Sequence, residues 1–220
     1  MSPQTHGAGP GSAPLLALVD LIVALKALPR TGWLDRGVAP LRAESVADHS
    51  FAVALLAWAA AVERQAAGAA LDPARVVLLA LVHDLAEAGA GDATPYDPAA
   101  MADLADDAAR RAFLERRHVR DASREAAKRT AEAEAMAALF ARLSPAIRAT
   151  LEGLWQELRE GSSAEARFVK QTDRLETYLQ SRAYLRDDPD LPVASFQKEV
   201  DETIDDPLLA ALRDAALQRP

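Results

Sequence analysis

One short segment places an imidazole beside a carboxylate, His83-Asp84, with a second carboxylate four residues after the histidine at Glu87. The apolar run at residues 76–81 precedes it and predicts a buried helix. Polar groups beside a core are costly unless something pairs with them, and a metal ion is a natural partner. On a helix, His83 and Glu87 share a face, while Asp84 is rotated by about 100°. One ion can therefore take His83 and Asp84 while Glu87 faces whatever the ion holds.

Two further residues complete a candidate ligand set. His49 lies 34 residues before His83, and Asp173 lies 89 residues after Asp84, each on an expected helix. Two imidazoles and two carboxylates suit one divalent ion, among Co, Mn, Fe, Zn and Mg, with positions left for water and substrate. The chain has no cysteine, which excludes a thiolate site. Because only four histidines occur in the chain, this combination is far more specific than a His-Asp pair alone.

The segment at residues 30–40 holds Arg30, Trp33 and Arg36 between glycines and prolines, which predicts a loop. Two arginines and a tryptophan in so short a loop suggest a binding surface. Taken alone, the loop favours the plainer interpretation, in which Trp33 packs on the core and the arginines are solvated. His118 lies in a charged region and, by itself, indicates a surface histidine.

Helical spacing of apolar residues dominates the rest of the chain, and alternation typical of strands is not evident. The expected helices cover residues 15–28, 44–65, 73–89, 101–120, 123–143, 145–160 and 164–185, with short segments at 196–204 and 207–217. Asp72 is the expected N-cap of the third helix, with Pro73 at its first position. The fold class is therefore all-α.

Composition limits the remaining possibilities. The 220 residues are 50% hydrophobic, which is enough for the core of one domain, expected at residues 14–220. A formal charge of −8 argues against nucleic acid as a partner, because phosphate backbones need a basic surface. The apolar run at 15–28 contains Asp20 and Lys26 and is too short to span a membrane. Residues 1–13 are rich in Gly, Pro and Ser without an export pattern, which predicts a disordered tail and a cytoplasmic protein.

Six blocks in this order resemble the HD-domain metal-dependent phosphohydrolases, and within them the 5′-deoxynucleotidase group. The blocks are residues 25–33, 36–38, 44–50, 80–87, 91–95 and 165–176. The resemblance covers roughly residues 15 to 185, and it implies an HD-domain helical bundle with a mononuclear metal site. The implied activity is release of phosphate from (deoxy)nucleoside 5′-monophosphates by an enzyme that takes a small-molecule nucleotide and forms a homodimer.

The resemblance also assigns roles by position. His49, His83, Asp84 and Asp173 match the metal ligands. Glu87 matches the catalytic carboxylate, and Asp92 matches a second acidic residue near the sugar and phosphate. Trp33 and Arg36 match the loop that meets the nucleotide, and Arg30 is a neighbouring phosphate contact, which reverses the plainer interpretation of that loop.

The chain departs from the family pattern in one long segment. Residues 96–125 form an expected helical insertion directly after Asp92. It is expected to be a lid over the pocket, a dimer element or a lengthened surface helix, and the sequence leaves these open. Gly32 stands where some bacterial members have an arginine, which leaves the phosphate contact open between Arg30 and Arg36.

Two alternatives remain for function. The first is an HD phosphatase acting on a modified nucleotide in a salvage or biosynthetic pathway, which the insertion keeps open. The second is a catalytically silent nucleotide-binding module, which the presence of Glu87 beside a full ligand set argues against. A dinuclear site needs extra histidines before Asp173, and only His118 is available.

Overall fold

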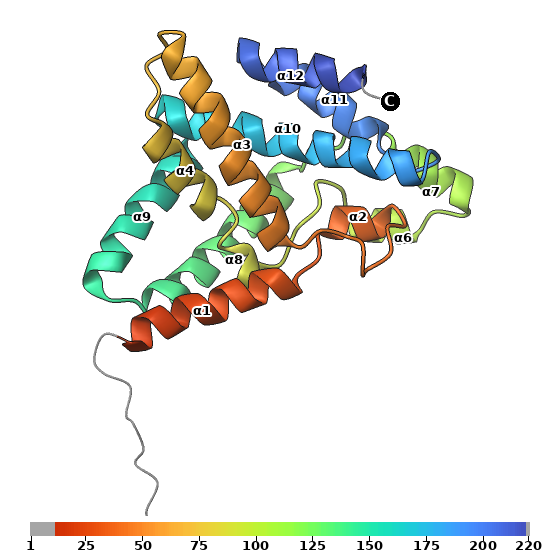
Figure 1. Ribbon diagram of the computed structural model, residues 1–220. Helices are drawn as coiled ribbons and strands as arrows, with labels where there is room; N and C mark the ends of the chain where they lie inside the picture. Colours follow the sequence, from red (N-terminus) through yellow and green to blue (C-terminus); the bar gives the residue numbers. More distant parts are fainter. Residues whose placement is uncertain (1–11, 219–220) are drawn as a thin grey trace, which may run out of the picture.

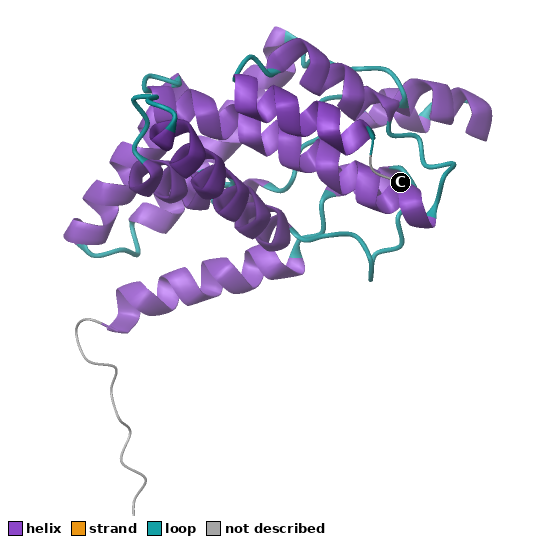
Figure 2. Ribbon diagram, turned by 45° about the horizontal axis from the view of Figure 1, so that its top comes forward, coloured by secondary structure: helices purple, strands orange, loops and turns teal. Residues whose placement is uncertain are grey.

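The protein is built from α-helices, which confirms the expected fold class. The computed structural model describes residues 12–218, and no strand occurs within that range (Figures 1 and 2). The helices are α1 (Ser12–Ala27), α2 (Thr31–Asp35), α3 (Val46–Ala66), α4 (Pro73–Val82), α5 (Glu87–Ala90), α6 (Pro98–Ala102), α7 (Asp107–Leu114), α8 (Ala122–Phe140), α9 (Pro145–Glu160), α10 (Ala164–Asp187), α11 (Ala194–Thr203) and α12 (Pro207–Leu217).

The first helix begins inside the expected N-terminal tail. Residues 1–11 of that tail lie outside the described range, while Ser12 and Ala13 already belong to α1. The segment at 30–40, expected to be a loop, contains the single-turn helix α2.

Helix α3 starts at a well-defined cap and carries the first candidate ligand. Ser45 is its N-cap, and the side chains of Ser45 and Asp48 form a reciprocal capping box. An isolated bridge between Pro29 and Ser45 ties this cap to the end of α1. His49 therefore enters the core one turn after a fixed helix start, and its exposed fraction is 0%.

The prediction of one continuous helix at residues 73–89 is wrong. The Asp72 cap and Pro73 are as expected, but α4 ends at Val82, and α5 begins only at Glu87. The intervening turn is held by hydrogen bonds three residues apart, from Leu85 N–H to Val82 O (3.3 Å) and from Glu87 N–H to Asp84 O (3.0 Å). This tighter winding rotates successive side chains by about 120° instead of 100°. His83, Asp84 and Glu87 thus lie on a tightened turn rather than on one regular α-helix.

Helix α10 passes through the middle of the main core (Figure 1). Its buried side chains pack with α3, α4, α9, α11 and α12, and they include Phe168, Val169, Leu175 and Tyr178. Because α10 is held along its length, Asp173 is fixed against α3 and α4 from the other side of the core.

A second cluster joins α1, α8 and α9 beneath the His83-Asp84 turn. Ala86 packs there with Met136, Leu139 and Phe140. A Cβ placed on Gly89 would lie 3.0 Å from the Cβ of Ala135, so a larger residue here would push α5 and α8 apart by a few tenths of an ångström. The turn that carries the candidate ligands is therefore held in place by packing against α8.

The long helix expected at 101–120 is also wrong, because the segment folds as two short helices, α6 and α7. Asp106 caps α7 by accepting from Ala109 N–H, which requires a break before it. Tyr96, Met101, Phe113 and Leu114 form a small core of this segment's own. The expected helix at 123–143 corresponds to α8.

Helix α3 is the one candidate membrane span in residues 12–218, judged by length and hydropathy alone. It carries His49 inward and packs on α4 and α10, as the central helix of a globular core does.

Candidate metal centre and adjoining cavity

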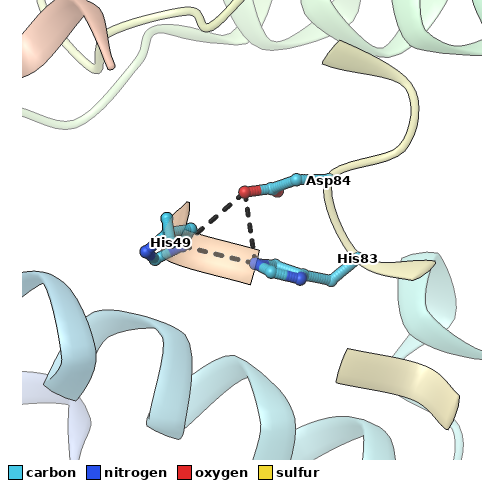
Figure 3. A group of neighbouring side chains, drawn as sticks. All are labelled: His49, His83 and Asp84. Carbon is cyan, nitrogen blue, oxygen red and sulfur yellow. Dashed lines mark hydrogen bonds and ion pairs between the residues drawn. The ribbon is translucent and has the colours of Figure 1, made fainter. Parts of the chain in front are cut away.

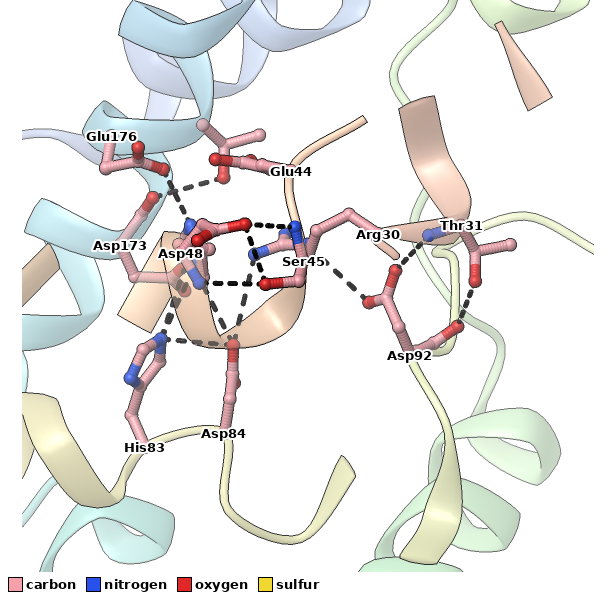
Figure 4. Close-up of polar contacts among 12 residues, drawn as sticks. Arg30, Thr31, Glu44, Ser45, Asp48, His83, Asp84, Asp92, Asp173 and Glu176 are labelled. Atoms are coloured by element: carbon pink, nitrogen blue, oxygen red, sulfur yellow. Dashed lines mark hydrogen bonds and ion pairs between the residues drawn. The ribbon is translucent and has the colours of Figure 1, made fainter. Parts of the chain in front are cut away.

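His49, His83 and Asp84 converge on one point (Figure 3), and Asp173 of α10 joins them from another part of the chain (Figure 4). His49 Nε2 lies 3.4 Å from His83 Nε2 and 3.6 Å from Asp84 Oδ2. His83 Nε2 lies 3.1 Å from Asp84 Oδ2. Asp173 Oδ1 lies 3.0 Å from His49 Nε2 and 4.0 Å from His83 Nε2. The structure thus brings together all four residues expected to be ligands.

Both imidazoles are oriented by hydrogen bonds from their other ring nitrogen. His83 Nδ1 donates to the carbonyl of Ala80 at 2.7 Å, and His49 Nδ1 lies 2.6 Å from Glu176 Oε2. With Nδ1–H donated outward, each Nε2 faces the centre and can offer a lone pair to an ion that displaces its proton. Such outer partners are what fix the tautomer of metal-binding histidines.

The separations match the ligands of a single ion. Two ligands held at about 2.1 Å from one ion lie roughly 3.0 Å apart at a right angle and roughly 3.4 Å apart at the tetrahedral angle. The separations among His49, His83 and Asp84 run from 3.1 to 3.6 Å. The donor set of two nitrogens and two carboxylate oxygens fits a divalent transition metal.

Electrostatics stabilise the charged forms of these residues. Although burial and Arg30 oppose it, the hydrogen bonds with Asp173 and Glu176 raise the pKa of His49 to about 10. Burial would raise the pKa of Asp84, but His83 and His49 hold it well below its usual range. Metal binding has to displace protons from this site.

Glu87 lies beside the centre as a buried carboxyl group without a partner. It is 7% exposed, and its Oε2 has no hydrogen bond. Burial, together with the neighbouring Asp84 and Asp92, raises the pKa of Glu87 to about 9. A carboxyl group held this way carries a proton near neutral pH and can donate it.

Arg30 lies between two carboxylates at the edge of the centre (Figure 4). Its Nη1 is 3.9 Å from Asp84 Oδ2, and its Nε is 3.8 Å from Asp92 Oδ1. Nη1 is buried and has no hydrogen-bond partner. Asp92 also accepts from Thr31 N–H at 2.5 Å, which fixes the start of α2 next to Arg30. A guanidinium nitrogen with an unused donor therefore lies beside the ligands.

Trp33 and Arg36 are buried instead of open to solvent. Trp33 is 1% exposed and donates its Nε1–H to Glu44 Oε1 at 2.7 Å. Arg36 is 8% exposed, and four of its donor contacts are already used within the protein. Its acceptors are Pro192 O (3.0 Å), Gly32 O (2.9 Å), Ser195 Oγ (2.9 Å) and Leu114 O (3.3 Å). Both residues build the wall of the site and leave few donors for a ligand.

Glu176 and Glu44 were not anticipated from the sequence as part of the site. Glu176 lies three residues after Asp173, one helical turn along the same face, and this spacing was the available signal. Glu44, His49 and Glu176 bring polar atoms within 4.8 Å of one another. Burial and the adjacent Glu176 raise the pKa of Glu44 to about 7. These two carboxyl groups form the layer behind His49.

A cavity of about 90 Å³ opens next to Arg30 and Asp92. Its walls are residues 30–36, the turn at 92–96, residues 116–118 and the facing sides of α10 and α11. Thr177 on α10 lies one turn beyond Asp173, so the cavity begins next to the candidate ligands. Residues 96–120, which contain α6 and α7 and are called the 96–120 segment below, thus form one side of the cavity.

A helical bundle that directs two imidazoles, two aspartates and an unpartnered glutamate at one point has the architecture of a metal-dependent hydrolase. The model of the HD domain family matches residues 22–207, and the chain belongs to the HD domain family. The family expected from the sequence is thus confirmed.

Characterised relatives are similar over most of the chain. Human 5′-deoxynucleotidase HDDC2 is 37% identical over 176 residues, which are 80% of this chain and 71% of the human protein. The 5′-deoxynucleotidase hdd1 of Schizosaccharomyces pombe is 28% identical and covers 80% of this chain and 74% of its own.

Solved structures share the fold. The PH0347 protein from Pyrococcus horikoshii OT3 has a TM-score of 0.63 at 27% identity, covering 92% of this chain and 97% of its own. A predicted metal-dependent phosphohydrolase from Magnetospirillum magnetotacticum MS-1 has a TM-score of 0.56 at 25% identity, covering 94% and 96%.

Proposed function

We propose that this protein is a metal-dependent phosphohydrolase that releases phosphate from (deoxy)nucleoside 5′-monophosphates. The observation that carries the proposal is the placement of Arg30 Nη1 and Glu87 Oε2, two buried polar atoms without hydrogen-bond partners, beside the four candidate ligands. Unpartnered buried polar atoms are costly, and a phosphate ester satisfies both of them. The relatives named as 5′-deoxynucleotidases support the nucleotide as the substrate.

His49, His83, Asp84 and Asp173 would hold the ion. A bound divalent ion would polarise a phosphoryl oxygen and lower the pKa of a water molecule. Arg30 donates from Nη1 to a second phosphoryl oxygen, and this charge-assisted hydrogen bond strengthens as charge develops in the transition state. Asp92 holds Arg30 in this position through the ion pair at 3.8 Å.

Glu87 moves the proton. Burial, Asp84 and Asp92 raise the pKa of Glu87 in the metal-free protein, which favours the protonated carboxyl group. It can therefore give its proton to the departing 5′-oxygen and later recover one from water. Gln at this position preserves the shape of the side chain and removes the proton transfer.

The nucleoside would occupy the cavity beside Arg30. Arg36 and Trp33 act here as positioning residues, because their polar groups bind the protein and hold the cavity wall together. Asp92 and Thr177 border the path from the centre to the cavity, where the sugar would lie.

We propose that the protein is a homodimer that works in the cytoplasm, where nucleotide substrates occur. Helices α1, α3 and α4 adjoin and expose eleven large apolar side chains, each 40–68% exposed. These are Leu15, Leu16, Val19, Ile22, Val23, Phe51, Leu55, Trp58, Val62, Leu78 and Leu81. Together they present on the order of 1,000 Å², against about 800 Å² per partner in a standard interface. The partner is a second copy of this chain, since one self-complementary patch suffices for a twofold dimer.

The test is a phosphate-release screen of purified protein loaded in turn with Co, Mn, Fe, Zn or Mg. The substrates are nucleoside 5′-monophosphates with ribose, deoxyribose or a modified sugar. We expect release from the deoxynucleotides with at least one of these ions, and one ion bound per chain. A protein that binds no divalent ion, or that releases no phosphate from any nucleotide, overturns the proposal.

A further inference from the structure

The cavity beside the metal centre carries more positive charge than one scissile phosphate needs. Four arginines line it, Arg30, Arg36, Arg116 and Arg117, against two carboxylates, Asp92 and Glu199. Arg30 faces the metal centre and is paired with Asp84 and Asp92 there. The other three arginines lie farther along the cavity wall.

Arg36 is a buried cation that forms no ion pair with a carboxylate in residues 12–218. All four of its hydrogen-bond acceptors are neutral, namely three carbonyls and one hydroxyl. Its guanidinium also lies 4.3 Å from the ring centre of Phe196. Asp35 and Glu199 act on Arg36 only at longer range, so burial still lowers its pKa, and an anion in the adjoining cavity would offset that cost.

Arg116 and Arg117 come from the segment between α7 and α8. The Arg116 guanidinium lies 5.5 Å from the Phe113 ring, and it too forms no ion pair with a carboxylate among the described residues. Arg117 pairs with Glu202 through Nη1 at 2.9 Å, but its Nε is buried and has no hydrogen-bond partner. Arg116 is exposed, so its donors and the Nε of Arg117 are available to a ligand at this part of the cavity wall.

We propose that Arg116 and Arg117 form a subsite for a second anionic group on the substrate, with Arg36 adding its field from the cavity wall. The inference rests on the proposed function and narrows its substrate class. The substrate is then a nucleoside 5′-phosphate with a second negative group, either a phosphate on the sugar or a carboxylate on the base. A plain monophosphate fills the metal end and leaves the second subsite without an anion.

The size of the cavity limits how much of the substrate it holds. About 90 Å³ is less than the roughly 300 Å³ at the lower end of ligand sites, so the cavity as it stands holds only part of a nucleotide. The 96–120 segment, which forms one wall, has its own small core. Its links to the body are largely polar, such as Lys198 to Glu115 O (3.1 Å) and Arg110 to Asp35 O (3.5 Å).

The experiment measures binding by calorimetry in Mn²⁺-loaded Glu87→Gln protein, which holds nucleotide without turning it over. The probes are a deoxynucleoside 5′-monophosphate, the same nucleotide with an added 3′-phosphate, and a pyrimidine 5′-monophosphate with a carboxylate on its base. We expect at least one doubly anionic probe to bind about tenfold or more tightly than the monophosphate, the size of one charge-assisted contact. The probe that binds more tightly than the monophosphate shows whether the second group is a sugar phosphate or a base carboxylate.

The decisive variant is Arg116→Gln, and its matched control is Arg110→Gln, the same charge change on the same segment outside the cavity lining. The affinity ratio of doubly to singly anionic probe should fall to about one in Arg116→Gln and stay as it was in Arg110→Gln.

Equal affinities for all probes, or the same fall in ratio for both variants, overturn the second subsite. The proposed function survives either result if wild-type protein still releases phosphate from the plain monophosphate. Absence of phosphate release from every probe by wild-type protein overturns the proposed function instead.

Discussion

The Nε2 atoms of His49 and His83 face each other across 3.4 Å, and each ring is anchored through its Nδ1. Without metal, the two nitrogens can carry protons because Asp173 and Asp84 lie 3.0 and 3.1 Å from them. A bound divalent cation would replace those protons and keep the same two carboxylates as its counter-charge.

Metal binding is predicted to release protons and to strengthen as the pH rises. The pKa of His49 is raised to about 10 without metal, so near neutral pH the ion displaces at least one proton. The apparent affinity should rise about tenfold per pH unit for each proton displaced, between about pH 6 and 8. Calorimetry in two buffers with different ionisation enthalpies measures the number of protons released per bound ion. His118→Gln is the control, because His118 packs on Tyr96 and Phe113 away from the ligands. An affinity that is flat over this range would contradict the assignment.

Glu87→Gln is predicted to abolish phosphate release while stabilising the metal-free fold at alkaline pH. The folded pKa of Glu87, about 9, lies above its ordinary value of 4.5. Its contribution to stability is therefore complete below about pH 4.5 and is lost as the pH rises toward 9, by at most roughly 1.4 kcal/mol per pH unit. Urea unfolding at several pH values should show that the unfolding free energy of the variant increases relative to that of wild type from about pH 5 to 9. Glu134→Gln, on the exposed side of α8, should follow wild type. Undiminished phosphate release in Glu87→Gln would remove the catalytic role.

Lysine substitutions at Arg30 and Arg36 are predicted to have opposite effects. The first should lower activity with little effect on stability, and the second should lower stability. Arg30→Lys loses the Nη1 donor next to the ligands, so kcat/KM should fall about 100-fold with little change in unfolding free energy. Arg36→Lys keeps the charge but loses most of four hydrogen bonds inside the fold, so stability should fall by about 2–4 kcal/mol. Phosphate release and urea unfolding, measured on both variants, separate the roles. The reverse ordering would make Arg36 the phosphate contact.

The apolar face formed by the exposed side chains of α1, α3 and α4 is predicted to be the dimer interface. Leu55→Glu places a charge at the centre of the α3 part of that face, where Leu55 is 53% exposed, and should convert the dimer to monomer. Leu41→Glu is the matched control, because Leu41 is fully exposed outside the face. Sedimentation equilibrium gives the mass of each. A wild-type protein that stays monomeric at tens of micromolar would refute the dimer.

Helical periodicity in the sequence was enough to locate most of the helices, and residue types, together with the family resemblance, pointed to the four candidate ligands that the fold brings together. The end of α4 at Val82 was missed because neither glycine nor proline marks it. His83 and Ala86 keep right-handed helical dihedral angles, and only the change to shorter-range hydrogen bonds ends the helix. Local sequence carries no signal for that change.

The role of Arg36 could not be predicted from the sequence for a different reason. Its acceptors lie up to 159 residues away, at Ser195, and no local pattern encodes such a contact. Burial of the Arg36 side chain follows from how α11 and the 96–120 segment close over α2, which only the assembled fold reveals.

The contact between His49 and Glu176 spans 127 residues of sequence, so the site is completed late during synthesis. A ribosome that has made residues 1–160 has supplied His49, His83 and Asp84 but neither Asp173 nor the hydrogen-bond partner that orients His49. The growing chain therefore lacks a complete metal site until α10 has emerged.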